Sequence, residues 1–330
     1  MPHPRPAISI ITPTYNRQTA LARAIRSVQR QSLNDYEHII VDDGSHDDTE
    51  RFVRELGDER IRYHRFSEWR GANSARNAGM QMARAEWLTF LDSDDQYLPH
   101  RLAAIGRAIS TSRSDLLLSS FTTMKRGRER TAVNPDALLT AAELEELLVM
   151  HGVFIAGSSI TVRKRTLERM GGFDPSLMRM QDRDVLLRLS RNCGARLLAG
   201  VDWVKHPSAD SISGNRKGYV AALGNLFAAH PQISEQYRSA LGYHVARSVL
   251  SDLVGLRFRQ AMDSLSENND ATVLQFGWLE LARSYFAGTS RRRALAKSLR
   301  ERPDPDCVIL SLEAFRLEQA AQMATFKRAA

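Results

Sequence analysis

The nine residues Trp87–Asp95, which read WLTFLDSDD, join an apolar run to three carboxylates within four positions. The apolar part predicts a buried strand over 87–91. Side chains two positions apart on an extended backbone point to the same side, so Asp92 and Asp94 can face one ligand together. Three neighbouring carboxylates repel one another unless a cation or several donors neutralise them. The stretch therefore indicates either a cation site, with Asp95 in a supporting role, or a solvated acidic turn in which Asp95 caps the following helix.

Strand-like and helix-like segments alternate ahead of this stretch and just after it. We expect strands at 7–12, 36–41, 60–64 and 87–91, and helices at 19–31, 47–56, 71–85 and 98–110. Such alternation predicts an α/β fold with a mainly parallel sheet and helices on both faces. Ligands bind such sheets at the carboxyl ends of the strands. Polar clusters follow Thr12, Val41 and Leu91, so we expect chemistry at that edge. Pro13, directly after Thr12, is expected to end the first strand.

The rest of the chain is less regular and then becomes helical. Strands are expected at 116–121, 158–162 and 196–204, with a basic turn at 125–130 and helices at 141–150 and 181–191. From about Gly218 helical periodicity dominates, at 223–229, 237–256, 258–265, 273–287, 291–300 and 310–326. We place a boundary near 214–218, with an α/β domain over 1–215 and a smaller all-helical domain over 216–330. The helical domain could contact an acceptor, a membrane surface or a second subunit.

The composition, with 43% hydrophobic and 25% charged residues among 330, is that of an ordinary globular protein. The net charge of +8 favours anionic partners: nucleotide-linked substrates, acidic lipid surfaces or nucleic acid. The two cysteines, Cys193 and Cys307, lie far apart, which argues against a disulfide framework or zinc site and favours a reduced, cytoplasmic compartment. No signal peptide or apolar run of about 18 residues is evident, so any membrane contact should be peripheral.

Five motifs in order resemble the family 2 glycosyltransferases of the GT-A fold. They are Ile11–Arg17 (ITPTYNR), Val41–Ser45 (VDDGS), Gly71–Gly79 (GANSARNAG), Phe90–Asp95 (FLDSDD), and Gly171–Leu177 (GGFDPSL) followed by Gln181-Asp182. The resemblance covers roughly residues 7–213. It implies an inverting single displacement that moves a sugar from a nucleotide sugar, most plausibly UDP-linked, to a hydroxyl of a saccharide or lipid-linked saccharide. It also implies a divalent metal, Mn²⁺ or Mg²⁺.

The resemblance further implies roles for single residues on the donor side. Asp94 matches the metal-binding aspartate, and Asp92 matches its partner near the ribose, with Ser93 between them. Asp43 matches the residue that accepts a hydrogen bond from the base, and Pro13 and Tyr15 match residues that line the base pocket. Arg76 matches a residue near the base and diphosphate. The side chains suit these tasks. A carboxylate accepts from an imide N–H, a tyrosine ring stacks on a base, and an arginine donates to a diphosphate.

On the acceptor side the resemblance implies that Asp182 is the general base, which takes the proton of the attacking hydroxyl. Asp184 competes for this role, although a carboxylate in the first helical turn is also explained by the helix dipole. His206 matches a histidine that completes the metal site. The Gly-Ser pair that usually follows this histidine is replaced by a longer segment, 207–211, and a lone histidine is more often an ordinary packed residue.

Two other functions fit parts of the sequence. A metal-dependent sugar nucleotidyltransferase would need a glycine-rich basic loop after the first strand, and 12–17 has no glycine. A basic nucleic-acid-binding protein would concentrate basic and aromatic residues, which are dispersed here. The basic residues Arg291–Arg293, Lys297, Arg300 and Arg302 beside Leu295 and Leu299 fit either a solvated face or an amphipathic helix on an anionic membrane.

Overall fold

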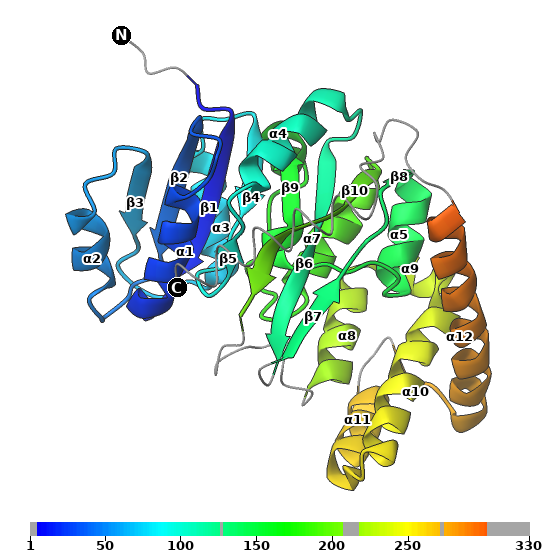
Figure 1. Ribbon diagram of the computed structural model, residues 1–330. Helices are drawn as coiled ribbons and strands as arrows, with labels where there is room; N and C mark the ends of the chain where they lie inside the picture. The colour runs from blue at the N-terminus through cyan, green and yellow to red at the C-terminus, as the bar shows by residue number, and fades with distance from the viewer. Residues whose placement is uncertain (1–4, 126–127, 207–217, 271–273, 302–330) are drawn as a thin grey trace.

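The computed structural model describes residues 5–125, 128–206, 218–270 and 274–301 (Figure 1). Strands and helices alternate up to Thr111, as the sequence predicts. The elements of this part are β1 (Ile8–Thr14), α1 (Gln18–Gln29), β2 (Tyr36–Asp42), α2 (Thr49–Glu55), β3 (Ile61–Arg65), α3 (Ala72–Met82), β4 (Trp87–Phe90), the short β5 (Gln96–Tyr97) and α4 (Arg101–Thr111).

The second part mixes short strands and helices before the chain becomes helical. Its elements are β6 (Leu116–Lys125), β7 (Arg128–Ala132), β8 (Ala137–Leu139), α5 (Ala141–Val149), the 3-10 turn η1 (Gly157–Ser159), β9 (Ile160–Arg163), α6 (Lys164–Arg169), α7 (Gln181–Ser190) and β10 (Ala195–Lys205). The last part consists of α8 (Tyr219–Ala228), α9 (Pro231–Gln236), α10 (Arg238–Val254), α11 (Phe258–Asp270) and α12 (Trp278–Glu301).

One sheet runs through the molecule in the order β3-β2-β1-β4-β9-β6-β10-β5, with β7 beside β6 and β8 beside β10. The first four strands pair in parallel, as does β10 with β6. Antiparallel pairs join β9 to both of its neighbours and attach β5, β7 and β8. The α/β class is confirmed, and β6 and β7 form a hairpin across the region expected as a basic turn.

Helices cover both faces of the sheet, as expected, because side chains alternate along each strand. Ile10 packs with Ala24 of α1 and Leu102 of α4 on one face. Ile11, the next residue, packs with Ala75 of α3 on the other face. The strands β1 and β2 are therefore buried along their whole length, as in a sheet that is covered on both sides.

Pro13 does not end the first strand, which continues to Thr14. The strand β2 pairs with β1 as far as Thr14, whereas β4 pairs with β1 only as far as Ile11. The carbonyl of Ile11 accepts from the Leu91 N–H and therefore points toward β4. The backbone of Pro13, two residues later, has the same orientation. The N–H that proline lacks would thus point to the side where β4 has already ended, so no pairing is lost. The prediction that proline stops this strand was therefore wrong.

The C-terminal helices share a hydrophobic core with the sheet. Phe227 of α8 and Leu241 of α10 belong to the same buried cluster as Leu148 of α5 and Val185 of α7. The two helices expected at 273–287 and 291–300 form one continuous helix, α12. The helix expected at 310–326 and most of the expected boundary at 214–218 lie outside the described residues, so the division into two domains stays a prediction.

No helix within the described ranges combines the length and apolar character needed to cross a membrane.

A buried ion pair fixes α4 against the sheet. The guanidinium of Arg101 pairs with Asp202 of β10, and the two side chains are 0% and 3% exposed. It also donates to the Ser158 carbonyl at 2.7 Å and lies 4.3 Å from the centre of the Tyr97 ring. Burial raises the pKa of Asp202, while Arg101 opposes that rise. Loss of the guanidinium would leave an uncompensated carboxylate in the interior.

We predict that Arg101→Ala lowers the free energy of unfolding by about 3–5 kcal/mol, because Asp202 would stay buried without its partner. Urea denaturation of both proteins measures the difference. Arg107→Ala, on the exposed side of the same helix, is the control and should change stability by less than about 0.5 kcal/mol. Equal effects of the two substitutions would contradict the prediction.

Candidate active site

Asp43 follows β2 and organises the loop that leads into α3. Its two carboxylate oxygens accept hydrogen bonds from the backbone N–H groups of Arg70 and Gly71, at 2.7 and 2.8 Å. Burial raises the pKa of Asp43, although both amide hydrogen bonds act in the opposite direction. Gly71, at φ 90°, begins α3 in a conformation that side chains rarely adopt. Asp43 thus sets the entry of α3, and each oxygen keeps a second lone pair for a ligand.

The loop after β1 is tied to the loop after β2. The backbone N–H of Asn16 donates to the Ser45 hydroxyl at 2.8 Å, and the His46 N–H donates to the Asn16 side chain at 2.7 Å. Tyr15 is 37% exposed on this loop, whereas Pro13 is buried within β1. Pro13 and Tyr15, which were expected to line a base pocket, therefore lie at the same edge of the sheet as Asp43, whose N–H donates to the Thr14 carbonyl.

The acidic segment after β4 is held by arginines from two different helical regions. Arg76 of α3 donates to Asp92 at 2.7 Å, and Arg17, just before α1, donates to Asp94 at 3.3 Å. Arg76 is almost fully buried, and its guanidinium lies 5.3 Å from the centre of the Phe173 ring. Ser93, between the two aspartates, is also buried. The ion pair places Arg76 beside the acidic segment, and its expected role near the base and diphosphate stays a prediction.

The three carboxylates of this segment differ in their protonation tendencies. Burial would raise the pKa of Asp92, but Arg76 and Lys205 outweigh it and leave the pKa lowered. Burial and the charge of Asp92 raise the pKa of Asp94, and they raise that of Asp95 much further. Asp95 accepts from the Ser158 hydroxyl at 2.7 Å. It does not cap the following helix, contrary to one interpretation of the sequence, because α4 begins only at Arg101.

Asp182, the expected general base, lies in the first turn of α7 and faces Asp92 across Gly157. A Cβ atom at Gly157 would lie 3.1 Å from Asp92 Oδ1 and 3.4 Å from Asp182 Oδ1. Asp182 Oδ1 is buried and has no hydrogen-bond partner among the described residues. Burial raises the pKa of Asp182, Arg76 opposes this, and Asp92 adds to it. The fold thus brings the carboxylate that was expected on the acceptor side close to Asp92, which was expected on the donor side.

Lys205, at the end of β10, is a cation that the sequence analysis missed. Burial acts to lower its pKa, but the charges of Asp95, Asp92, Asp182 and Asp94 raise it above its ordinary value. A single ammonium group therefore interacts with all four carboxylates. The repulsion within the acidic segment indicated that a cation was needed, but only the pairing of β10 with β5 and β6 brings this lysine to the site.

His206 follows Lys205 and forms a hydrogen bond between its Nε2 and the Gln96 side chain, at 3.0 Å. Burial and the nearby Arg23 lower its pKa to about 4, so the ring is neutral at physiological pH. Within the described parts of the chain, no group of three or more His, Cys, Asp or Glu side chains is arranged to hold a metal ion. The role of His206 as a metal ligand stays a prediction.

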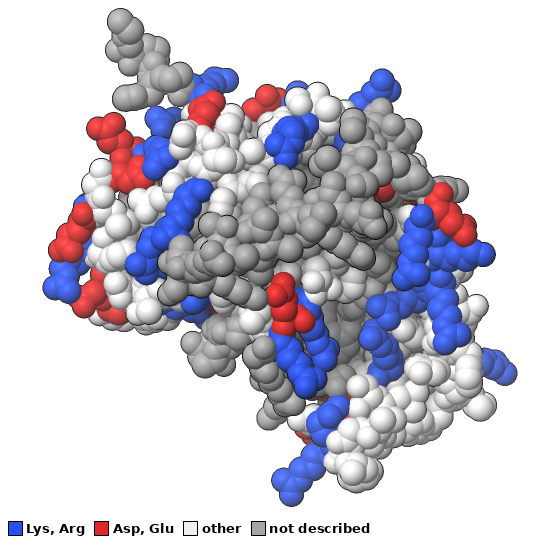
Figure 2. Space-filling view, in the orientation of Figure 1, with Lys and Arg blue, Asp and Glu red and all other residues white. Residues whose placement is uncertain are grey.

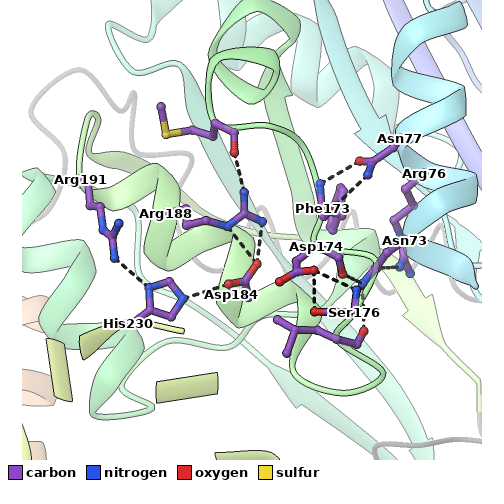
Figure 3. Close-up of polar contacts among 12 residues, drawn as sticks. Asn73, Arg76, Asn77, Phe173, Asp174, Ser176, Asp184, Arg188, Arg191 and His230 are labelled. Atoms are coloured by element: carbon purple, nitrogen blue, oxygen red, sulfur yellow. Dashed lines mark hydrogen bonds and ion pairs between the residues drawn. The ribbon is translucent and has the colours of Figure 1, made fainter. Parts of the chain in front are cut away.

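Two asparagines of α3 hold the loop that contains GGFDPSL (Figure 3). Asn77 exchanges two hydrogen bonds with the backbone of Phe173, at 2.7 and 2.8 Å. Asn73 donates to the carbonyls of Asp174 and Leu177, and its oxygen accepts from Arg76 at 3.0 Å. The third and fifth of the motifs are therefore physically joined, and Arg76 is oriented by the residue that holds the loop.

Asp184 anchors α7 through polar contacts to Arg188 and His230 (Figure 3). Its carboxylate accepts from Arg188 at 2.6 Å and bonds to His230 Nε2 at 2.9 Å. Arg191 lies 3.0 Å from His230 Nδ1, and because arginine only donates, Nδ1 accepts and Nε2–H donates to Asp184. Asp184 is thus fully engaged, which favours Asp182 as the base. It links the start of α7 to the turn between α8 and α9.

The assembled edge combines three chemical capabilities. Asp43 and Tyr15 offer a carboxylate and an aromatic ring at the ends of β1 and β2. Asp92 and Asp94 offer oxygens that suit a hard cation or a ribose hydroxyl. Asp182 offers a buried carboxylate oxygen that can accept a proton. These groups come from separate segments and converge where the parallel strands end, as expected for such sheets.

Residues 9–171 match the family model described as Glycosyl transferase family 2. A curated relative, GalNAc(5)-diNAcBac-PP-undecaprenol beta-1,3-glucosyltransferase of Campylobacter jejuni, is 42% identical over 103 residues, which are 30% of this chain and 33% of that protein. The chain therefore spans only about a third of the length of curated relatives such as this one.

Two solved structures share the fold over most of both chains. S. aureus TarS 1-349 in complex with UDP-GlcNAc superposes with a TM-score of 0.64 at 14% identity, covering 89% of this chain and 91% of that one. The mannosyltransferase PcManGT from Pyrobaculum calidifontis, in complex with GDP-Man and Mn²⁺, gives a TM-score of 0.53 at 17% identity, covering 90% and 85%. These likenesses confirm the expected fold.

We predict that His230→Ala lowers the free energy of unfolding by about 1–3 kcal/mol, because Asp184 would lose a buried hydrogen bond and Arg191 a partly buried one. Urea denaturation measures the change. His46→Ala is the control, since the side chain of His46 is exposed, and it should be nearly neutral. A neutral His230→Ala would mean that this network does not hold α7.

Proposed function

Because the chain belongs to glycosyl transferase family 2, matched over residues 9–171, we propose that it moves a sugar from a nucleoside-diphosphate sugar to a hydroxyl of a saccharide or lipid-linked saccharide. The observation that carries this proposal is the approach of Asp182 to Asp92 across Gly157. It joins a proton acceptor to a set of groups suited to a sugar nucleotide. A lipid-linked acceptor is supported by the name of the Campylobacter relative, which refers to a PP-undecaprenol.

The donor in this proposal is UDP-linked. Asp43 would accept the imide N–H of uracil, Tyr15 would stack on the base, and Pro13 would line the pocket. Arg76 and Asp92 would contact the diphosphate and ribose, with Ser93 beside them. The complex of TarS with UDP-GlcNAc supports a uridine nucleotide, while the complex of PcManGT with GDP-Man makes the base a matter for experiment.

The acidic segment fits a hard divalent cation. Asp94 stands at the strand end with a pKa raised by burial and by Asp92, a cost that a cation would relieve. Asp95 Oδ1 and Asp182 Oδ1 are buried and lack hydrogen-bond partners among the described residues. Asp94 would hold Mn²⁺ or Mg²⁺, and His206 would join it only if its Nε2 left Gln96. When bound, the ion would neutralise charge on the diphosphate.

The proposed reaction is a single displacement with inversion. Asp182 takes the proton of the acceptor hydroxyl while that oxygen attacks the anomeric carbon, and the nucleoside diphosphate leaves from the opposite side. Arg76 keeps Asp92 ionised, and Asp92 in turn raises the pKa of Asp182, which makes Asp182 a better proton acceptor. Asp92 and Asp182 thus act as an unequal pair, in which Asp92 stays ionised and Asp182 takes the proton.

We place this reaction in the cytoplasm. Cys193 is a free thiol, which agrees with a reduced compartment, and the second cysteine, Cys307, lies outside the described residues.

We predict that Asp182→Asn reduces kcat by about 100- to 10,000-fold, because the attacking hydroxyl would keep its proton. The binding of UDP, measured by calorimetry, should not change. The pH profile of the unmodified protein gives a second measurement. Since the base must be ionised and its pKa is raised, activity should fall as the pH drops through a value above 3.8, the ordinary pKa of aspartate.

Asp35→Asn, an exposed carboxylate far from the acidic cluster in sequence, is the matched control and should keep full activity. Normal transfer by Asp182→Asn would remove this residue from the mechanism. Loss of UDP binding in the same variant would mean that the substitution disturbs the donor site instead.

A second prediction concerns the metal. UDP-sugar with Mn²⁺ should raise the melting temperature, since a ligand at a hundred times its Kd adds about 2.7 kcal/mol of stability. EDTA should remove most of this shift, and Asp94→Asn should remove its Mn²⁺-dependent part. GDP-sugars, tested in parallel, decide between the two bases. Asp48→Asn on the exposed start of α2 is the control. An unchanged shift in EDTA would contradict the metal.

A further inference from the structure

Two arginines contact the acidic segment after β4, and they differ in how firmly they are held. Arg76 donates to Asp92 at 2.7 Å, and the Arg76 side chain is 4% exposed. Arg17 donates to Asp94 at 3.3 Å, and the Arg17 side chain is 30% exposed. An ion pair that is longer and more open to water is weaker. The pair between Arg17 and Asp94 is therefore the one that can be exchanged for another interaction.

Arg76 is fixed by groups other than its acid. The side-chain oxygen of Asn73 accepts from its guanidinium at 3.0 Å, and the guanidinium lies 5.3 Å from the centre of the Phe173 ring. Both contacts would remain if Asp92 turned to a ligand. Arg76 is thus a permanent part of the site.

Arg17 lies where the loop after β1 enters α1. It is the residue directly before that helix and has non-helical backbone angles, φ −143° and ψ 37°. The preceding residue, Asn16, is tied by its backbone N–H to the Ser45 hydroxyl. The backbone of Arg17 is therefore held at the carboxyl edge of the sheet, while its long, partly exposed side chain can turn to another partner at that edge.

Different arginines hold the backbone and the carboxylate of Asp94. Arg23 of α1 donates to the Asp94 carbonyl at 2.8 Å, which fixes the main chain at this point. Arg17 donates instead to a side-chain oxygen, Oδ2. The Asp94 side chain is 20% exposed, so an ion can reach it. A change at Arg17 would therefore release the carboxylate without releasing the backbone that carries it.

The charge of Asp94 is incompletely offset even beside Arg17. Burial and Asp92 raise the pKa of Asp94, although Arg17 and Lys205 act in the opposite direction. A divalent ion carries twice the charge of a guanidinium and bonds directly to carboxylate oxygens. It would therefore offset this carboxylate more completely than Arg17 does. The positive charge that already lies at Oδ2 opposes its approach.

We propose that Arg17 holds the place of the metal at Asp94 until the nucleotide-sugar donor binds. Without the donor, the guanidinium and a divalent ion compete for one carboxylate, so the ion alone binds weakly. The diphosphate of the donor offers the guanidinium another partner, because arginine pairs strongly with phosphate oxygens. Arg17 then leaves Asp94 when the donor and the ion are both present.

This exchange would couple the binding of the ion to the binding of the donor. Such coupling is reciprocal, so each ligand raises the affinity for the other by the same factor. Removal of the Arg17 guanidinium should therefore have two opposite effects. The ion alone should bind more tightly, and the coupling should become weaker. A residue with a purely structural role would not tighten the binding of the ion. The inference rests on the proposed function, since it takes Asp94 as the metal ligand.

The test is calorimetric titration of the full chain with Mn²⁺ alone, and with UDP in EDTA or in saturating Mn²⁺. Arg17→Gln should bind Mn²⁺ alone about fivefold more tightly, the upper range for a partly exposed ion pair. The gain in UDP affinity that Mn²⁺ produces should fall by at least the same factor. Arg17→Lys keeps the positive charge and should bind Mn²⁺ nearly as weakly as the unmodified protein.

The control must separate the contact at Asp94 from the effect of net charge. The chain carries a net charge of +8, and Figure 2 shows lysines and arginines over both sides of the visible face. Arg26→Gln removes one positive charge from the exposed side of the same helix, α1, and should leave the binding of Mn²⁺ unchanged. Melting temperatures verify that every variant is folded.

Three results would overturn the inference. They are unchanged or weaker Mn²⁺ binding by Arg17→Gln, equal tightening by Arg26→Gln, and an unchanged effect of Mn²⁺ on the affinity of Arg17→Gln for UDP. Failure of the proposed function has a different signature, because the unmodified protein would then bind no nucleotide, with or without Mn²⁺. A protein that binds UDP normally but gains nothing from Arg17→Gln would keep the proposed function and lose only the role of Arg17.

Discussion

The structure depends on balancing four carboxylates that meet at one edge of the sheet. Asp92, Asp94, Asp95 and Asp182 are all largely withdrawn from water, and their mutual repulsion must be offset within the protein. The ion pair between Arg76 and Asp92, at 2.7 Å, is the centre of that balance. It keeps one carboxylate ionised, and that charge then raises the pKa of its neighbours. The same balance that permits folding therefore leaves Asp182 with a raised pKa.

The surrounding structure keeps these charges in place. Asn73 orients Arg76 while it holds the loop of Asp174, so the helix α3 that carries the arginine is joined to the segment before α7. Asp184 fixes α7 from its other side through Arg188 and His230. Asp182 lies between these two anchors. The polar contacts of Figure 3 are thus best understood as a frame around the acidic cluster, and not as further chemistry.

The C-terminal helices have a buried inner side and an exposed outer side. Their inner side contributes His230 and buried residues such as Phe227 and Leu241 to the core that supports α7. Their outer side leaves large apolar residues such as Val254 and Trp278 exposed. A solvated helical bundle would place polar residues on that outer face.

The sequence by itself determined the elements and motifs whose signals are local. The periodicity that gave β1, β2, β4 and α1, and the order of the five motifs, lies within short stretches, and Asp92, Asp94 and Asp182 could be singled out from them. Only the tertiary structure decided which charges meet. Lys205 reaches the acids because β10 pairs with β6, and Ser158 reaches Asp95 from the 3-10 turn η1 that precedes β9. The antiparallel strands and the exposure of Leu256 were equally hidden, because pairing and burial depend on residues far apart in the chain.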